Sequence, residues 1–345
     1  MAPFKSSLAK SAKQLLGFFN TADLGLRGAT QSTRLVVPVV DRFEATGGTT
    51  WNEPAPNGPG GETRRYRIHA FTNSASTENF QVTDLNPNPA FPATVEYYAI
   101  GGGGGGGAGS HTNGSGGGAG GFLTGSWTTA AATYTIRVGA GGGTNSSGTP
   151  TYIDGPNISA RTAWGGGKGG ENANAGTPGG SGGGAGGNDG PQRSGGTGDR
   201  QTGQSTPTGS SPPQGNPGGV GSGTAGGADN MSGGGGGAGQ AGGNGSGPGG
   251  PGSPQPGGYG KAIPSTWSIP PSYGAPGPDG SLRYFSGGGG AAGHPDSGGA
   301  FGAGGYGGGA GSGGAAVATS GGGGAGPNAS AAGSVYLRYI TNKNY

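Results

Sequence analysis

The chain has 345 residues, of which 96 are Gly and 27 are Pro, while only 28% are hydrophobic. This composition argues against an enzyme fold with an ordinary apolar core, and the lack of Cys excludes disulfides and thiolate metal sites. Charged residues make up 10% of the chain, with a formal net charge of +3, which is too sparse for a nucleic-acid groove. We therefore expect neither an enzyme nor a nucleic-acid-binding protein, and no cofactor.

The first 34 residues form a basic segment with an amphipathic pattern. Apolar residues recur there at the spacing of one helical face, and Asp23 is the single acidic residue. A helix of about a dozen residues is marginal alone in water, so this face needs a partner surface. It either packs on its own domain or, as we prefer, docks onto another protein. The residues predicted to dock are Leu8, Leu15, Leu16, Phe19, Lys5, Lys10 and Lys13.

Composition divides the chain into three parts. Residues 1–45 contain the docking segment, residues 46–62 are rich in Gly, Pro and Asn and are predicted to be a linker, and residues 63–345 form a glycine-rich domain. No apolar run approaches the roughly 20 residues that a bilayer-spanning helix needs. The stretch Leu15–Phe19 is too short for the apolar part of a signal peptide. We therefore expect no membrane span and no leader.

Strand signals follow the linker. Apolar and polar residues alternate in Arg65–Phe71, with Ile68 on one face and His69 on the other. Similar patterns occur at residues 80–82, 95–99, 134–138 and 335–340. Together they predict a small antiparallel sheet with one buried face.

Between residues 101 and 332 glycine comes in about ten runs, separated by inserts of unequal length. Such a composition is typical of disorder, because each ordered Gly costs about 0.5–1 kcal/mol more than Ala. Hydrogen bonds between neighbouring runs would offset this cost, since polyproline-II backbones direct their N–H and C=O groups outward. We therefore predict mostly irregular, polyproline-II structure: a bundle of about ten polyglycine-II helices, capped at one end by the small antiparallel β-sheet, with a short N-terminal α-helical anchor.

The order of the runs predicts where the inserts lie. If successive runs alternate in direction, the strands after the second and tenth runs both return to the sheet. Five inserts then lie at the far end of the bundle: 110–113, 144–164, 188–217, 251–286 and 312–319. Aromatic residues on such loops suit recognition of sugars or proteins. The candidates are Tyr152, Trp164, Tyr259, Trp267, Tyr273, Tyr284 and Phe285.

Some of these aromatic residues have an alternative role, which is to pack the loops against one another. For Trp164, which directly precedes a glycine run, packing is at least as good an interpretation as recognition. Trp267 and Tyr273 lie in the middle of a Pro-containing insert, so we expect them to be exposed.

Three ordered motifs resemble the glycine-rich domain of bacteriophage tail-fibre proteins. They are Tyr66–Thr72 with Val95–Ile100 before the first glycine run, Tyr134–Gly142 at an internal step, and Gly333–Tyr339 as a closing strand. From about residue 62 onward the chain is similar in plan to the T-even distal tail-fibre adhesin. The N-terminal segment departs from that family and resembles, more weakly, the N-termini of virion structural proteins from marine tailed phages.

The resemblance implies a virion structural protein, a tail-fibre or spike adhesin located on the outside of the particle. Its distal loops, with the aromatic candidates above, would bind a host outer-membrane protein or a surface polysaccharide. Its N-terminal segment would dock onto another virion protein. Two other functions stay open: a fibre or capsid decoration protein that binds no receptor, and an ice-binding protein with a flat, sparsely charged face.

Catalytic motifs are lacking. His69, His111 and His294 are isolated in the sequence, without the carboxylate or second histidine that zinc or general-base chemistry requires. No Gly-Lys-Ser/Thr step follows a glycine loop, so no phosphate-binding loop is predicted. We therefore name no catalytic residue and no metal ligand.

Overall fold

The computed structural model describes residues 43–342, apart from residues 59–60, 62, 86–90, 110–113, 188–190, 200–212, 223–230, 246–254, 294–300 and 312. The N-terminal α-helix and all seven docking residues predicted from the sequence lie outside these described residues.

One five-stranded antiparallel sheet, which we call the first sheet, begins with the first described residues. Its order is β1 (Glu44–Thr46), β4 (Thr77–Asp84), β7 (Thr133–Arg137), β8 (Thr151–Asp154) and β9 (Arg161–Ala163). The strand expected around residues 80–82 is β4, and the one expected at 134–138 is β7. In β7 the alternation places Tyr134 and Ile136 on the buried side, because successive side chains of a strand point to opposite faces.

A second five-stranded antiparallel sheet has the order β2 (Thr49–Pro54), β3 (Arg65–Phe71), β13 (Ser334–Thr341), β5 (Thr94–Ile100) and β6 (Phe122–Thr128). The C-terminal strand β13 lies between β3 and β5, so Leu337 is opposite both His69 and Tyr97. The strands expected at 65–71, 95–99 and 335–340 are confirmed as β3, β5 and β13.

Part of the segment predicted to be a linker forms a strand. Residues 49–54 form β2, in which Thr49 pairs with Ala70 and Pro54 with Arg65. Thr and Trp favour strands, and an open edge of β3 offers their backbone groups hydrogen-bonding partners. The composition of this segment indicated a flexible linker, but pairing with β3 orders residues 49–54 as a strand.

The two five-stranded sheets share a side-chain core. Phe43, Phe80, Tyr134 and Tyr339 are fully buried in one cluster that draws on strands of both sheets. The rings of Phe43 and Tyr339 lie 4.1 Å apart between centroids. This cluster holds β3, β5 and β13 against the first sheet, so it supplies the apolar burial that the glycine-rich parts lack.

The opposite face of the second sheet is also covered. A third antiparallel sheet, β10 (Lys261–Ile263), β12 (Arg283–Phe285) and β11 (Ala275–Pro276), accompanies a short 3₁₀ helix, η2 (Ser265–Trp267). Trp267 and Phe285 form one cluster with Ile68 and Tyr336 of the second sheet. The prediction of a single buried face is therefore wrong: β3 and β13 bury side chains on both sides.

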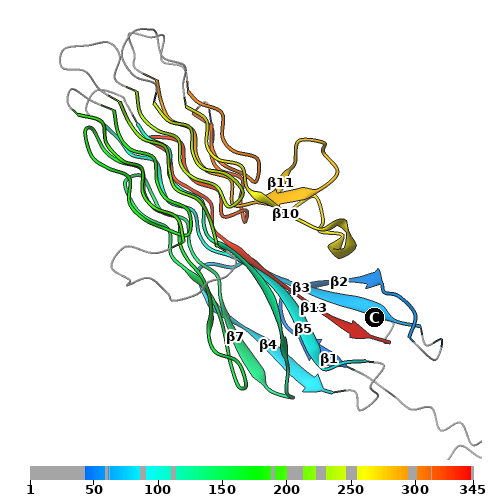
Figure 1. Cartoon of the computed structure of the whole chain (residues 1–345). Helices are drawn as coiled ribbons and strands as arrows, with labels where there is room; N and C mark the ends of the chain where they lie inside the picture. Colours follow the sequence, from blue (N-terminus) through cyan, green and yellow to red (C-terminus); the bar gives the residue numbers. More distant parts are fainter. Residues whose placement is uncertain are drawn as a thin grey trace, which may run out of the picture. The chain divides into compact units, whose positions relative to one another are not determined.

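Glycine segments run from the two five-stranded sheets toward the loops beyond them (Figure 1). Backbone hydrogen bonds join neighbouring segments: the Gly104 N–H donates to the Gly118 carbonyl, and the Gly118 N–H donates to the Gly167 carbonyl, each at 2.8 Å. A Cβ added at Gly104 would overlap the Gly167 carbonyl. The segments thus lie too close together for side chains between them. We call these segments the glycine region. They lie between residues 101 and 333, outside the strands and outside residues 261–286.

The glycine region has two ends. At the sheet end, Gly101 donates to the Gly121 carbonyl, directly after β5 and directly before β6. At the far end, Gly107 donates to the Ser115 carbonyl.

The predicted fold class, a polyglycine-II bundle with an α-helical anchor, is wrong. The regular structure consists of β-strands in three antiparallel sheets, and the described part of the chain contains no α-helix. The prediction took its fold class from the most abundant residue. The few apolar side chains decide the architecture instead, because they form two clusters on the faces of the second sheet.

The predicted alternation of ten runs is wrong as well. Residues 146–150 lie alongside the first glycine run, where the Gly102 N–H donates to the Thr149 carbonyl and the Gly105 N–H donates to the Ser146 carbonyl. This segment returns the chain to β8 within one predicted insert. Segments that carry Ser, Thr or Pro thus lie among the glycine segments. The predicted number of segments was wrong because only glycine-rich stretches were counted.

Candidate functional site

All seven aromatic candidates lie at the sheet end, not at the far end. Tyr152 is in β8, and Trp164 follows β9, where its carbonyl accepts a hydrogen bond from Gly121 at 2.7 Å. Tyr259 directly precedes β10. The remaining four belong to the segment that carries the third sheet: Trp267, Tyr273, Tyr284 and Phe285. Their far-end placement is therefore a correction, while receptor binding by any of them stays a prediction.

Residues 261–286, which we call the cap, are fastened to the second sheet by Trp267. Its side chain is only 3% exposed, so the expected exposure is wrong. The Arg338 guanidinium lies 4.3 Å from the ring centroids of both Trp267 and Tyr66, and Arg338 also pairs with Glu96. A cation over aromatic faces with little water around it gains about 2 kcal/mol. This sandwich ties the cap to β13, β3 and β5.

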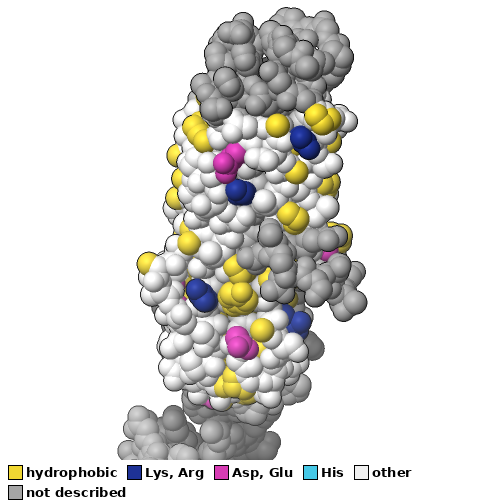
Figure 2. Space-filling model, turned by 90° about the vertical axis from the view of Figure 1, so that its left-hand side faces the viewer, with side chains coloured by type: hydrophobic (Ala, Val, Ile, Leu, Met, Phe, Trp, Pro, Cys, Tyr) yellow, Lys and Arg dark blue, Asp and Glu magenta, His cyan; other side chains and the backbone are white. Residues whose placement is uncertain are grey.

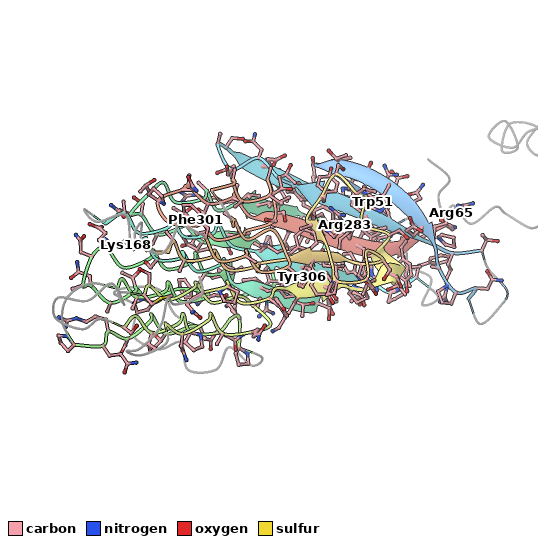
Figure 3. All side chains as sticks on the ribbon, turned by 90° about the horizontal axis from the view of Figure 1, so that it is seen from above. Trp51, Arg65, Lys168, Arg283, Phe301 and Tyr306 are labelled. Carbon is pink, nitrogen blue, oxygen red and sulfur yellow. The ribbon has the colours of Figure 1, made fainter. Side chains whose placement is uncertain are left out.

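A second contact holds the other side of the cap. The Tyr273 ring stacks on Trp51 of β2 at 6.1 Å, and Trp51 Nε1 donates to the Trp267 carbonyl at 3.4 Å. Arg283 donates to the carbonyls of Tyr273, Pro271 and Gly274 at 2.6–2.8 Å. Trp51 and Arg283 are labelled on these elements in Figure 3. The cap therefore uses its large side chains for packing, and Trp267 and Phe285 offer no surface to a ligand.

Two tyrosines differ from this pattern. Tyr259 is 47% exposed and Tyr306 is 40% exposed, and their ring centroids lie 4.9 Å apart at an interplanar angle of 55°. Tyr306 was not singled out from the sequence, because it sits inside a glycine run that was interpreted as bundle interior. Figure 3 labels Tyr306 between the glycine region and the third sheet. We call these two residues the tyrosine pair.

The backbone fixes the tyrosine pair in register. Gly257 donates to the Ala303 carbonyl at 2.9 Å, and three residues later Gly260 donates to the Tyr306 carbonyl at 2.6 Å. Tyr259 and Tyr306 therefore occupy matching positions on two neighbouring segments. Pro256 and Ala303, three residues earlier in each segment, are likewise exposed, which gives a period of three. This period is the signal that could have identified Tyr306.

The glycines between the exposed positions cannot carry side chains. A Cβ at Gly257 would overlap the Gly288 carbonyl, one at Gly258 the Gln240 carbonyl, and one at Gly305 the Gly258 carbonyl. Only the outward positions of these two segments are free to vary. The tyrosine pair thus stands on a surface whose backbone is hydrogen-bonded from several sides.

The far end carries small polar groups. Asn145 Oδ1 accepts from the Ala108 N–H at 2.6 Å, and Lys168 pairs with Glu171 at 3.1 Å. A hollow of about 220 Å³ is lined by Ala108, Gly109, Gly114, Phe301 and Pro327. Figure 3 shows Lys168 and Phe301 toward this end. On the face seen in Figure 2, charged side chains are few, and one basic side chain lies beside an acidic one. Among the residues described at the far end, no cluster of like charges is present that would attract an ionic ligand.

His69 belongs to the core rather than to a reactive site. Its side chain has no exposed surface, Nδ1 lies 2.6 Å from the Gly47 carbonyl, and Nε2 lies 3.5 Å from the Tyr339 hydroxyl. Burial lowers the pKa of His69 to about 4, while the hydrogen bond to Gly47 raises it and the charge of Arg67 lowers it. The imidazole is therefore neutral near pH 7 and out of reach of a substrate.

Neither a metal site nor a membrane-spanning helix is found among the described residues. In the described ranges no set of three or more His, Asp or Glu side chains is arranged to hold a metal ion. Those same ranges contain no helix of the length and apolarity that a bilayer crossing requires.

Comparison with known protein families matches residues 83–283, more than half of the chain, to the family described as Glycine-rich domain. The chain belongs to this glycine-rich domain family. The match begins in β4 and ends in β12, so the family covers most of the glycine region and part of each of the three sheets. No curated protein matches the chain.

Membership of the glycine-rich domain family agrees with the sequence at the coarse level of a glycine-rich domain. The match itself carries no link to a tail fibre. The resemblance of the strand-to-glycine motifs to tail-fibre proteins therefore stays a prediction.

Proposed function

We propose that this chain is a structural attachment protein on the outside of a phage particle, of the tail-fibre or spike type, which contacts the surface of a host cell. The observation that carries the proposal is the tyrosine pair: two exposed rings in matched register on a backbone whose intervening glycines leave no room for side chains. A rigid scaffold that presents aromatic residues suits recognition, because little conformational entropy is lost on binding. The motifs that resemble tail-fibre proteins support the same function.

The segments that carry the tyrosine pair show no catalytic group. Residues 255–260 and 301–306 contain no Ser, Thr, Lys, His, Asp or Glu, and the one described histidine, His69, is buried and neutral. In this proposal the three sheets form the base, and the glycine region holds its segments in fixed positions. The N-terminal segment, residues 1–34, would dock onto another virion protein.

Adsorption tests this function. Purified full-length chain should compete with particles for host cells, and the double variant Tyr259→Ala/Tyr306→Ala should lose that competition. Thr135→Ala serves as the control, because Thr135 is an exposed position of β7, in the first sheet, and is not among the recognition candidates. Equal competition by wild type and double variant would place the host contact elsewhere, and no competition by wild type would oppose the adhesin proposal.

The second candidate is a fibre or capsid decoration protein that binds no receptor. The burial of Trp267 and Phe285 favours it, since this role predicts that aromatic residues pack within the chain. Particles assembled without the chain distinguish the two functions. An adhesin predicts loss of adsorption to cells, whereas a decoration protein predicts unchanged adsorption with altered particle stability.

Docking has its own test. Deletion of residues 1–34 should release the protein from particles while the described domain stays folded. Retention of the shortened chain on particles would contradict the docking role of this segment without bearing on the host contact.

A further inference from the structure

We propose that the tyrosine pair binds an uncharged sugar, with a pyranose ring stacked on the exposed face formed by Tyr259 and Tyr306. This inference deepens the proposed function by naming the class of ligand, and it rests on that function for its biological setting. Its physical test uses only the purified chain.

The shape of the pair favours stacking over insertion. The ring centroids are 4.9 Å apart, so the two rings touch each other and leave no space for a ligand between them. The rings are tilted by 55°, and each tyrosine is exposed to solvent, so a ligand can lie against the outer side of the pair. One face of a pyranose ring is apolar, because its axial C–H groups point to that side. These C–H groups are weakly positive and match the negative π-face of an aromatic ring.

Polar groups flank the rings. Each phenol hydroxyl can donate and accept a hydrogen bond. Gly239, Gln240 and Ala241 form an exposed turn beside Tyr259, and the Gly239 and Gln240 N–H groups donate to the Tyr259 carbonyl at 2.8 and 3.1 Å. The backbone of Gln240, an exposed residue with an amide side chain, therefore lies beside that of Tyr259. Amide and hydroxyl groups are the partners that sugar hydroxyls need.

Charge argues against an anionic ligand. The two segments that carry the pair, residues 255–260 and 301–306, contain no charged residue. The nearest basic residue along the chain, Lys261, lies outside these segments and directs its ammonium to the Pro213 carbonyl at 3.4 Å. The two segments themselves therefore offer no cation, so a phosphate or sulfate group placed over the rings would lose hydration without a charged partner from them.

A protein partner fits this surface less well. A standard interface buries roughly 800 Å² on each side and involves about 20 side chains or more. Here two rings stand among glycines whose N–H groups at Gly257, Gly258 and Gly260 are already bonded within the chain. Within residues 255–260 and 301–306 the pair therefore has few side chains and few free donors beside it, whereas a single sugar ring needs only a small face and two or three hydrogen bonds.

The experiment is a titration of purified full-length chain with uncharged oligosaccharides of glucose, galactose and N-acetylglucosamine, followed by calorimetry. Wild type should bind at least one of these probes and should not prefer a sulfated counterpart. Tyr259→Ala and Tyr306→Ala should each weaken that binding by about tenfold or more, as expected for aromatic anchors. Tyr259→Phe should stay within about threefold, because stacking survives the loss of the hydroxyl.

Matched controls keep the result interpretable. Thr135→Ala, at an exposed position of β7, should leave the affinity unchanged. Thermal unfolding of each variant should stay close to that of wild type, because all the substituted residues are exposed. Failure of wild type to bind any probe, or equal binding by both Ala variants, would overturn the inference. A dimer of wild type that the Ala variants convert to monomer would also overturn it, by assigning the pair to a second copy.

The sugar inference and the adhesin proposal fail in different ways. If sugar binding depends on the pair but the chain does not compete for host cells, the adhesin proposal is contradicted and the sugar site stands. Competition for host cells that depends on the pair, without binding to any probe, would sink the sugar site and leave the adhesin.

Discussion

The sheets and the glycine region are held together by opposite means. Between the five-stranded sheets, large side chains such as Phe80 and Tyr134 are fully buried and supply the apolar contacts. In the glycine region, the corresponding volume is filled by backbone, and a Cβ at positions such as Gly117 would overlap a carbonyl. One region therefore depends on the presence of side chains and the other on their absence. The contrast predicts that opposite kinds of substitution damage the two regions.

The largest effect is expected from a truncation in the sheets. Phe80→Ala should destabilise the fold by about 3–5 kcal/mol, because it removes a buried ring and leaves a cavity. Phe80 lies between His69, Phe71, Tyr134 and Tyr339, with ring centroids 5.1–6.5 Å away. Chemical denaturation measures the change. A cost below about 1 kcal/mol would mean that the side-chain core does not dominate there.

The glycine region should respond to an enlargement instead. Gly117→Ala should cost about 3 kcal/mol, because its Cβ would overlap the Gly104 carbonyl and force segments apart. The matched control is Gly143→Ala, at a glycine whose Cβ would meet no atom within 4 Å. That variant should be neutral or stabilising by up to about 1 kcal/mol. Thermal unfolding of both variants decides the point, and similar costs would contradict the close approach at Gly117.

Acid should weaken the side-chain region selectively. The folded pKa of His69 is about 4, below the value of 6.5 for an unperturbed histidine, so the unfolded chain binds the proton more readily. Stability is therefore complete above pH 6.5 and falls as the pH drops from 6.5 toward 4, by about 3 kcal/mol in total. Denaturation between pH 7 and 5, above most carboxylate titrations, measures the slope. Replacing His111 and His294 by Gln should leave it unchanged, whereas a flat profile in the variant that retains His69 would contradict its buried state.

The smallest effect concerns the link between the cap and the second sheet. Arg338→Gln should cost about 1–2 kcal/mol, because it removes the cation between Tyr66 and Trp267 and leaves Glu96 without this partner. Amide exchange should quicken in residues 261–286 more than in β4 or β7. Arg137→Gln is the control, on an exposed position of β7. Equal exchange in the cap of both variants would mean that Trp267 is held by packing alone.

The alternation of side chains predicted the strands well. Arg65–Phe71 and Tyr134–Ile136 follow the two-residue period closely, and both lie in strands. The same period could not show how many faces would be covered. His69 was assigned to the more polar face of its strand, yet it is fully buried beside Phe80.

The candidate site was harder to predict. Tyr259 was named from the sequence as a receptor-binding candidate on a far-end loop, whereas the structure places it, exposed, directly before β10 at the sheet end. Its partner Tyr306 is 47 positions further along the chain and was not named. Their proximity arises from the register of two glycine segments, and glycine has no side chain whose pattern would reveal that register.

The residues alone dictate that the glycine-rich parts are stabilised by backbone hydrogen bonds if they are ordered, because a chain with 96 glycines has too few side chains to do so. They also dictate the strands, because alternating apolar side chains need a face to bury. Only the tertiary structure decided which segments are neighbours, that the cap covers the second sheet, and that two tyrosines meet at the surface. Backbone hydrogen bonds are alike at every glycine, so the partner of each segment depends on where the side-chain clusters anchor its ends.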